Sequence, residues 1–121
     1  YRTAYVATGK PGGKFRLRRL GGGLGHSAID PQVTASRNGT STVLWSEGAG
    51  SGPLAVHSAT RLPGGKYSAK PRSRPLADGY ISEVSVASSG DGNAVAVWIK
   101  SDGDSRYIKT ASTRAWKRGG L

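Results

Sequence analysis

The sequence predicts an all-β fold in which one four-stranded antiparallel unit is used more than once. Residues 7–15 read ATGKPGGKF and residues 59–67 read ATRLPGGKY, so nearly the same nine letters occur twice, 52 positions apart. Residues 33–45 and 86–98 form a second pair, VTASRNGTSTVLW and VASSGDGNAVAVW, separated by 53 positions, and each ends in Trp. Glycine accounts for 19 of 121 residues, which suits many tight turns between short strands. Repetition at a fixed period is typical of modular architectures.

One complete unit is expected over residues 31–75. The Asn-Gly pair at 38–39 supplies the two positive φ angles that a tight hairpin turn needs. The segment after it is rich in β-branched residues, which favour a pleated surface. A β-sandwich would also contain short strands, but it has no reason to repeat them at a fixed step. The four expected strands are 31–36, 41–46, 54–60 and 66–72.

Parts of two further units flank this complete one. Residues 1–20 match the last two strands of a unit, and residues 82–121 hold most of another. Ala7, Ala59 and Ala111 are then equivalent positions at a constant step of 52. The chain therefore holds roughly two and a quarter units of about 52 residues.

Two segments carry a resemblance to a known family. The strand Gly92–Trp98 and the turn Ala59–Tyr67 resemble bacterial, actinobacterial-type secreted β-propeller repeats, which are distantly similar to sialidase blades. The resemblance implies propeller blades, an exported protein, and a location that is extracellular or at the cell surface. Ser89–Trp98 begins like a sialidase Asp box, but its Trp comes too late, so we interpret it as a hairpin turn. Other blades of the same protein, or self-association into a ring, are then expected to cover the exposed blade faces.

Composition excludes several classes of site. The chain has no Cys, which rules out disulfides, thiolate metal sites and a Cys nucleophile. It has no apolar run near the roughly 18 residues needed for a membrane span. It also has no Met, so we expect a processed form, an excised piece or an engineered chain. The net charge of +11, from 18 Lys and Arg against 7 Asp and Glu, favours attraction to polyanions.

The loops after the second and fourth strands are expected to share one face, which in propellers usually carries the ligand. We predict a non-catalytic binding module that contacts carbohydrate or a cell-surface polymer there, with no catalytic residue, metal or cofactor. Asp102 and Asp104 alone fall short of the six to eight oxygens of a calcium site. Trp45 and Trp98 are expected to pack between units, although stacking on a sugar stays open. The candidate ligand-binding residues are His26, Trp45, Glu47, Asp78, Tyr80, Trp98, Asp102, Asp104 and Arg106.

Two alternatives remain. The chain could be part of a sialidase-like glycoside hydrolase whose catalytic residues lie elsewhere. It could instead be an electrostatic binder of polyanions or nucleic acid, although nucleic acid is not favoured because aromatics do not interleave with the charges. Alternation places Phe15 and Leu17 inward, and basic residues on fourth strands protect exposed edges. The candidate polyanion-binding residues are Lys14, Arg16, Arg18, Lys66, Lys70 and Arg72.

Overall fold

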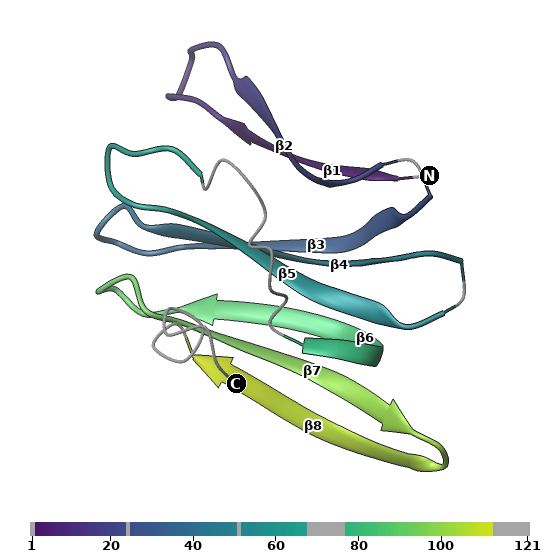
Figure 1. Cartoon of the computed structure of the whole chain (residues 1–121). Coiled ribbons are helices and arrows are strands. Elements are labelled where there is room, and N and C mark those ends of the chain that lie inside the picture. Colours follow the sequence, from purple (N-terminus) through teal and green to yellow (C-terminus); the bar gives the residue numbers. More distant parts are fainter. Residues whose placement is uncertain (1, 24, 51, 68–76, 113–121) are drawn as a thin grey trace.

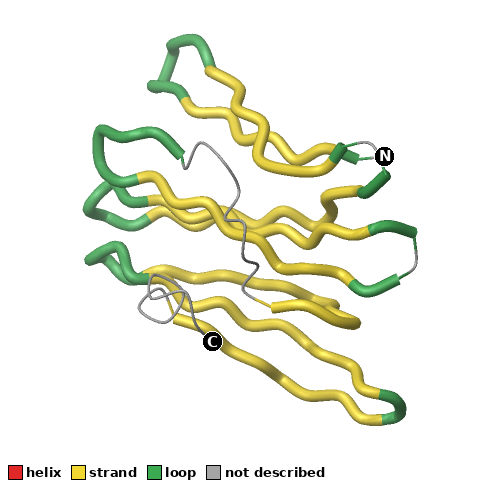
Figure 2. Tube along the Cα trace, viewed as in Figure 1, coloured by secondary structure: helices red, strands yellow, loops and turns green. Residues whose placement is uncertain are grey.

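The computed structural model describes residues 2–23, 25–50, 52–67 and 77–112. All regular structure in these ranges is β-strand, so the predicted all-β class is confirmed (Figure 2). In them, no helix is long and apolar enough to span a bilayer. The strands are β1 (Thr3–Thr8), β2 (Arg16–Gly22), β3 (Ser27–Ala35), β4 (Ser41–Gly48), β5 (Leu54–Arg61), β6 (Ala77–Ser88), β7 (Ala94–Asp102) and β8 (Ser105–Ser112).

The strands form three stacked layers (Figure 1). The first layer is the β1–β2 hairpin, and the remaining six strands form one antiparallel sheet in chain order. That sheet consists of a middle layer, β3–β5, and a last layer, β6–β8, and β6 connects the two layers. Its residues 77–79 pair with β5 at 54–56, and its residues from Tyr80 onward pair with β7.

The middle and last layers share local geometry at positions 53 apart. Each has a break in register within its first strand, with a residue at positive φ there: Asp30 at 50° and Glu83 at 52°. A non-glycine residue in this conformation is uncommon. Its occurrence at two positions 53 apart shows that the first strands of the two layers share the same local backbone geometry. Trp45 and Trp98 likewise lie at matching positions of β4 and β7, paired with His57 and Lys109.

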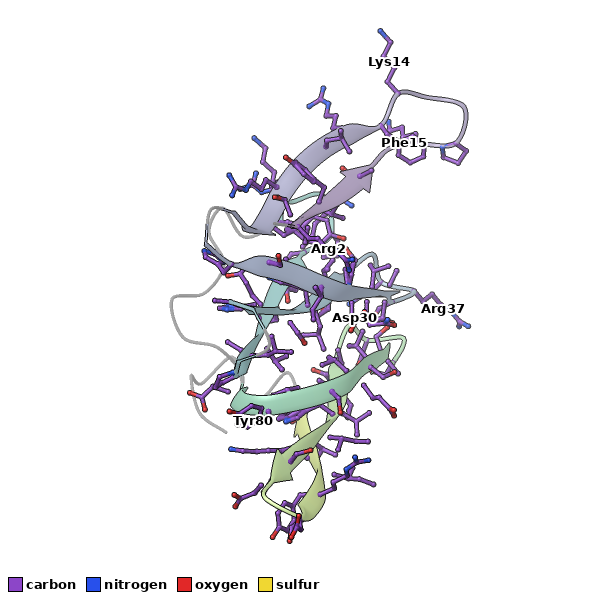
Figure 3. The ribbon with its side chains drawn as sticks, turned by 90° about the vertical axis from the view of Figure 1, so that its right-hand side faces the viewer. Arg2, Lys14, Phe15, Asp30, Arg37 and Tyr80 are labelled. Carbon is purple, nitrogen blue, oxygen red and sulfur yellow. The ribbon has the colours of Figure 1, made fainter. Side chains whose placement is uncertain are left out.

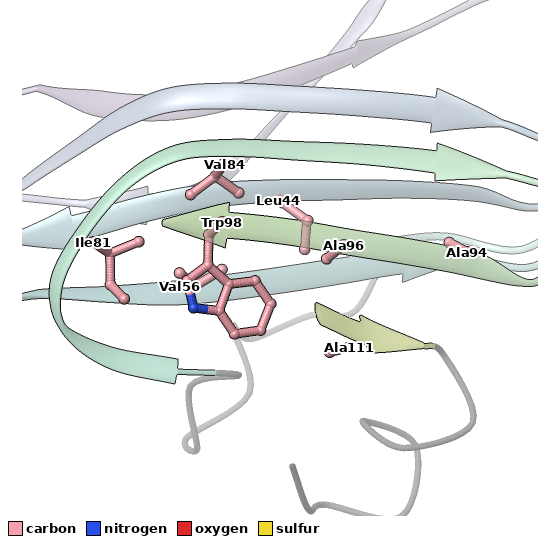
Figure 4. Packing of buried hydrophobic residues seen from close by; sticks show 8 residues of the cluster. All are labelled: Leu44, Val56, Ile81, Val84, Ala94, Ala96, Trp98 and Ala111. Atoms are coloured by element: carbon pink, nitrogen blue, oxygen red, sulfur yellow. The ribbon is translucent and has the colours of Figure 1, made fainter. Parts of the chain in front are cut away.

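Two apolar clusters hold the layers together. The first joins the hairpin to the middle layer: Ala4, Leu20, Ala28, Val43, Trp45, Ala59 and Tyr67. The second joins the middle layer to the last one, and Figure 4 shows Trp98 beside Val56 in it: Leu44, Val56, Ile81, Val84, Ala94, Ala96, Trp98 and Ala111. The middle layer therefore buries both of its faces, and removal of this apolar surface from water is the main stabilising contribution.

One predicted orientation is wrong. Phe15 and Leu17 were expected to face inward, but they are 68% and 73% exposed. In the hairpin, Thr8 pairs with Arg16 and Val6 with Arg18, so these arginines share the inward face with Leu20. Burial of Leu20 at 3% exposure fixes this choice, because a shift of one residue would turn every side chain to the other face. Most of the expected strand 66–72 lies outside the described residues.

Candidate functional site

A cleft opens at the end of the layers formed by the turns at 9–15, 36–40 and 62–66, which we call the turn end. It consists of two adjoining cavities of about 730 and 350 Å³ that share Thr8, Arg16, Arg61 and Tyr67 in their walls. We call this the basic cleft, because its described lining includes six cationic side chains: Lys10, Lys14, Arg16, Arg18, Arg61 and Lys66.

The two Pro-Gly-Gly-Lys turns of the sequence build opposite walls of the cleft with the same conformation. The N–H of Gly13 donates to the carbonyl of Lys10 at 2.9 Å, and the N–H of Gly65 donates to that of Leu62 at 2.9 Å. Gly12 and Gly64 have φ angles of 75° and 72°, which glycine adopts without steric cost. The two turns therefore place Lys10 and Lys14 on one wall of the cleft and Lys66 on the other.

The interior of the cleft is fixed by a few hydrogen bonds. The Nε of Arg61 donates to the carbonyl of Gly65 at 2.8 Å. The hydroxyls of Tyr67 and Ser41 lie 2.6 Å apart, and Tyr67 is only 6% exposed, so it is wall rather than contact surface. Phe15 is different: it is 68% exposed and stands with Lys14 at the tip of the hairpin (Figure 3). Phe15 is thus the accessible aromatic ring of the described lining.

The electrostatics of the cleft favour an anionic ligand. No carboxylate occurs among the described residues that line either cavity. Within the described ranges, the ion pairs are two histidine contacts with Glu47, and none involves a cleft residue. The Nε of Arg18 is buried without a hydrogen-bond partner. A buried donor without a partner costs free energy. An anionic oxygen of a ligand would accept a hydrogen bond from this N–H.

A polar cluster lies at the opposite end, the loop end, around the carboxylate of Glu47. Its Oε1 accepts hydrogen bonds from the N–H of Gly22 and from Nε1 of Trp45, the latter at 3.3 Å. Its Oε2 lies 3.3 Å from Nδ1 of His26 and 3.9 Å from Nε2 of His57. The rings of Trp45 and His57 stack with centroids 5.7 Å apart. Glu47 therefore connects the hairpin to the middle layer, and its oxygens are occupied by these neighbours.

The residues predicted for the loop face fall into separate groups. His26 and Glu47 belong to the polar cluster, whereas Trp45 and Trp98 are 0% and 2% exposed, so both rings pack between layers, as the sequence favoured. Tyr80 is 59% exposed beside a cavity of about 270 Å³. The exposed residues Asp78, Asp102, Asp104 and Arg106 lie on β6, on β8 and around the turn between β7 and β8.

Four of the six residues predicted to bind a polyanion belong to the basic cleft. Lys14, Arg16, Arg18 and Lys66 all line the basic cleft. Lys70 and Arg72 lie outside the described residues. Sequence reasoning missed Lys10, Arg61 and the exposure of Phe15, although the duplicated turn was the signal that could have located the first two.

Metal binding finds no support in the described ranges, which contain no group of three or more His, Cys, Asp or Glu side chains suited to hold an ion. Comparison with known proteins finds no matching family, no matching curated protein and no matching solved structure.

Proposed function

We propose that the chain is a non-catalytic binding module that takes an anionic carbohydrate polymer in the basic cleft. The observation that carries the proposal is a lining of six cations and one exposed aromatic ring, with no carboxylate among the described lining residues. Guanidinium groups bind sulfate and carboxylate oxygens in a bidentate manner. An exposed ring such as Phe15 packs against the apolar face of a sugar.

In this proposal the stacked layers are blades of a β-propeller, and the parent protein is an exported bacterial one that acts outside the cell or at its surface. The shared bulges, turns and Trp positions at steps of 52 and 53 support a blade repeat. A binding module needs no catalytic group, cofactor or metal. The ligand site differs from the loop face expected from sequence, because the cavities with concentrated charge lie at the turn end.

Carbohydrate is favoured over nucleic acid because of the aromatic content of the cleft. Proteins bind single-stranded nucleic acid by stacking successive bases on several aromatic side chains. Of the two aromatic residues in the described lining, Tyr67 is buried and only Phe15 is accessible. One accessible ring suits one sugar, while the cations on both sides suit a charged chain that extends past it.

The test is calorimetric titration with a sulfated oligosaccharide and its unsulfated counterpart at several salt concentrations. Arg16→Gln is expected to weaken binding about tenfold, as loss of a charge-assisted hydrogen bond does, and to lower the salt slope by about one. Phe15→Ala should weaken binding with an unchanged slope. Arg106→Gln removes the same charge from β8, outside the cleft lining, and is the matched control.

Three results would contradict the proposal. Equal losses for Arg16→Gln and Arg106→Gln would mean that the whole surface attracts anions without a site. Equal binding of the unsulfated oligosaccharide would remove the role of charge. Tighter binding of single-stranded DNA than of the sulfated oligosaccharide would make the ligand a nucleic acid.

A further inference from the structure

The same interface occurs twice between the layers of this chain. Where the hairpin meets the middle layer, the buried residues of the middle layer include Trp45 and Ala59. Where the middle layer meets the last one, Trp98 and Ala111 occupy the matching places, 53 and 52 positions later. Each layer therefore covers the Trp-bearing face of the next.

The opposite face of the last layer has no layer against it in the described structure. In the first two layers, the residues that point to the following layer include Ala4 and Val56, which are 5% and 0% exposed. The position 52 residues after Val56 is Ile108, which is 76% exposed. Val95 on the neighbouring strand is 51% exposed. We call this surface the last-layer face: Val95, Val97, Ile99, Ile108 and Thr110.

The hairpin has the complementary open surface. Ala59 and Ala111 are 2% and 4% exposed because each lies under a preceding layer, whereas the equivalent Ala7 is exposed. Leu17, which pairs with Ala7, is 73% exposed, and Tyr5 is 58% exposed. We call this surface the hairpin face: Tyr5, Ala7 and Leu17. One half of the repeated interface is thus open at each end of the stack.

The charges of the two end layers have opposite signs. Residues 2–22 carry six Lys and Arg and no Asp or Glu. Residues 77–112 carry five Asp and Glu and three Lys and Arg. Opposite charges around an apolar centre steer two surfaces together and fix their orientation. Two last-layer faces would instead place acidic layers against each other.

We propose that a second copy of this chain docks head to tail, with its hairpin face on the last-layer face of the first. The contact reproduces the interface that already joins the layers within one chain. Because the two faces differ, the association is heterologous, and it continues until a ring closes or a filament grows. The hairpin face adjoins the basic cleft, because Ala7 and Leu17 also line its cavities. The docking rests on the repeated interface and not on the ligand of the cleft, and Tyr5, the residue changed in the test, lies outside that lining.

The test is sedimentation analysis of wild type and two variants, Tyr5→Glu on the hairpin face and Ile108→Glu on the last-layer face. Wild type is expected to associate with increasing concentration, and each variant alone is expected to be a monomer. An equimolar mixture of the variants should form a one-to-one dimer, because each retains the face that the other lacks. Leu62→Glu changes a residue that is 60% exposed but lies on neither face, and it should associate like wild type.

Other outcomes overturn the proposal. Wild type that stays monomeric at the highest concentration measured would show that the faces do not dock. Association of Tyr5→Glu alone would mean that last-layer faces pair with each other. A mixture that stays monomeric would exclude the head-to-tail contact. Leu17→Glu and Thr110→Glu form a second pair if circular dichroism shows that either first variant is unfolded.

Discussion

At the scale of single residues, the two matching tryptophans differ in their hydrogen bonding. The Nε1 of Trp45 donates to Glu47, two residues later on the same strand face. Trp98 is equally buried, yet its Nε1 has no partner. The residue two positions after it is Lys100, and an ammonium group cannot accept a hydrogen bond. The last layer therefore contains an unsatisfied donor where the middle layer has a satisfied one.

This difference predicts that Lys100→Glu stabilises the fold. A carboxylate at this position can accept from Nε1 of Trp98 as Glu47 does from Trp45. The free energy of unfolding should rise by about 1 kcal/mol, the usual net gain of one hydrogen bond, as measured by urea denaturation. Lys109→Glu makes the same charge change opposite Trp98 on β8. If both variants change stability equally, charge rather than the hydrogen bond is responsible.

At the scale of elements, the tight turns at 36–40 and 89–93 are held by the same bonds. In both, an Asx side chain accepts from the backbone N–H two residues later: Asn38 from Thr40 at 2.9 Å, and Asp91 from Asn93 at 3.1 Å. The hydroxyl of Ser89 also donates to Asp91. These hydrogen bonds, that from Ser89 above all, hold the pKa of Asp91 below its ordinary value of 3.8.

A lowered pKa in the folded state makes Asp91 a source of acid sensitivity. Its stabilising contribution is present above the ordinary carboxyl pKa and is lost as pH falls through the lower folded value. Asp91→Asn keeps the acceptor, as Asn38 does in the matching turn, but no longer titrates. Below pH 4 its unfolding free energy should therefore decline less steeply than that of wild type. Asp104→Asn, on the turn between β7 and β8, is the control, and identical pH profiles for wild type and Asp91→Asn would refute the role of Asp91.

The same elements mark how far sequence reasoning reaches. Turn chemistry and β-branched runs were enough to predict β4, β5, β7 and the positions of the turns at 36–40 and 89–93, because these signals are local. The expected conformation of the first turn was wrong, since only Gly39 of the Asn-Gly pair has a positive φ. The face of β2 that lies inward could not be predicted, since Arg16 and Leu17 alternate and the apolar stem of an arginine can lie inward as well as a leucine side chain can. Contacts of Leu20 and Val6 with the middle layer decide it. The basic cleft depends on that outcome, because it combines β2 with a turn about 50 residues later.

At the scale of the whole molecule, charge and open surface are distributed unevenly along the stack. The basic cleft lies at the turn end, beside the hairpin, whose charged side chains within residues 2–22 are all cationic. The last layer is acidic on balance and carries an open apolar face. One surface therefore suits an anionic ligand and another suits a second copy, and both follow from stacking one kind of sheet with unequal charges.

An NMR titration of the labelled chain with the sulfated oligosaccharide would locate the ligand site residue by residue. We expect the amide chemical shifts to change mainly at residues 9–18 and 61–67, which build the basic cleft. The amide chemical shifts of the loop end should not change, at His26, Tyr80 and Asp102–Arg106. If the largest changes occur at the loop end, or if small changes spread over every basic residue, the basic cleft is not the ligand site.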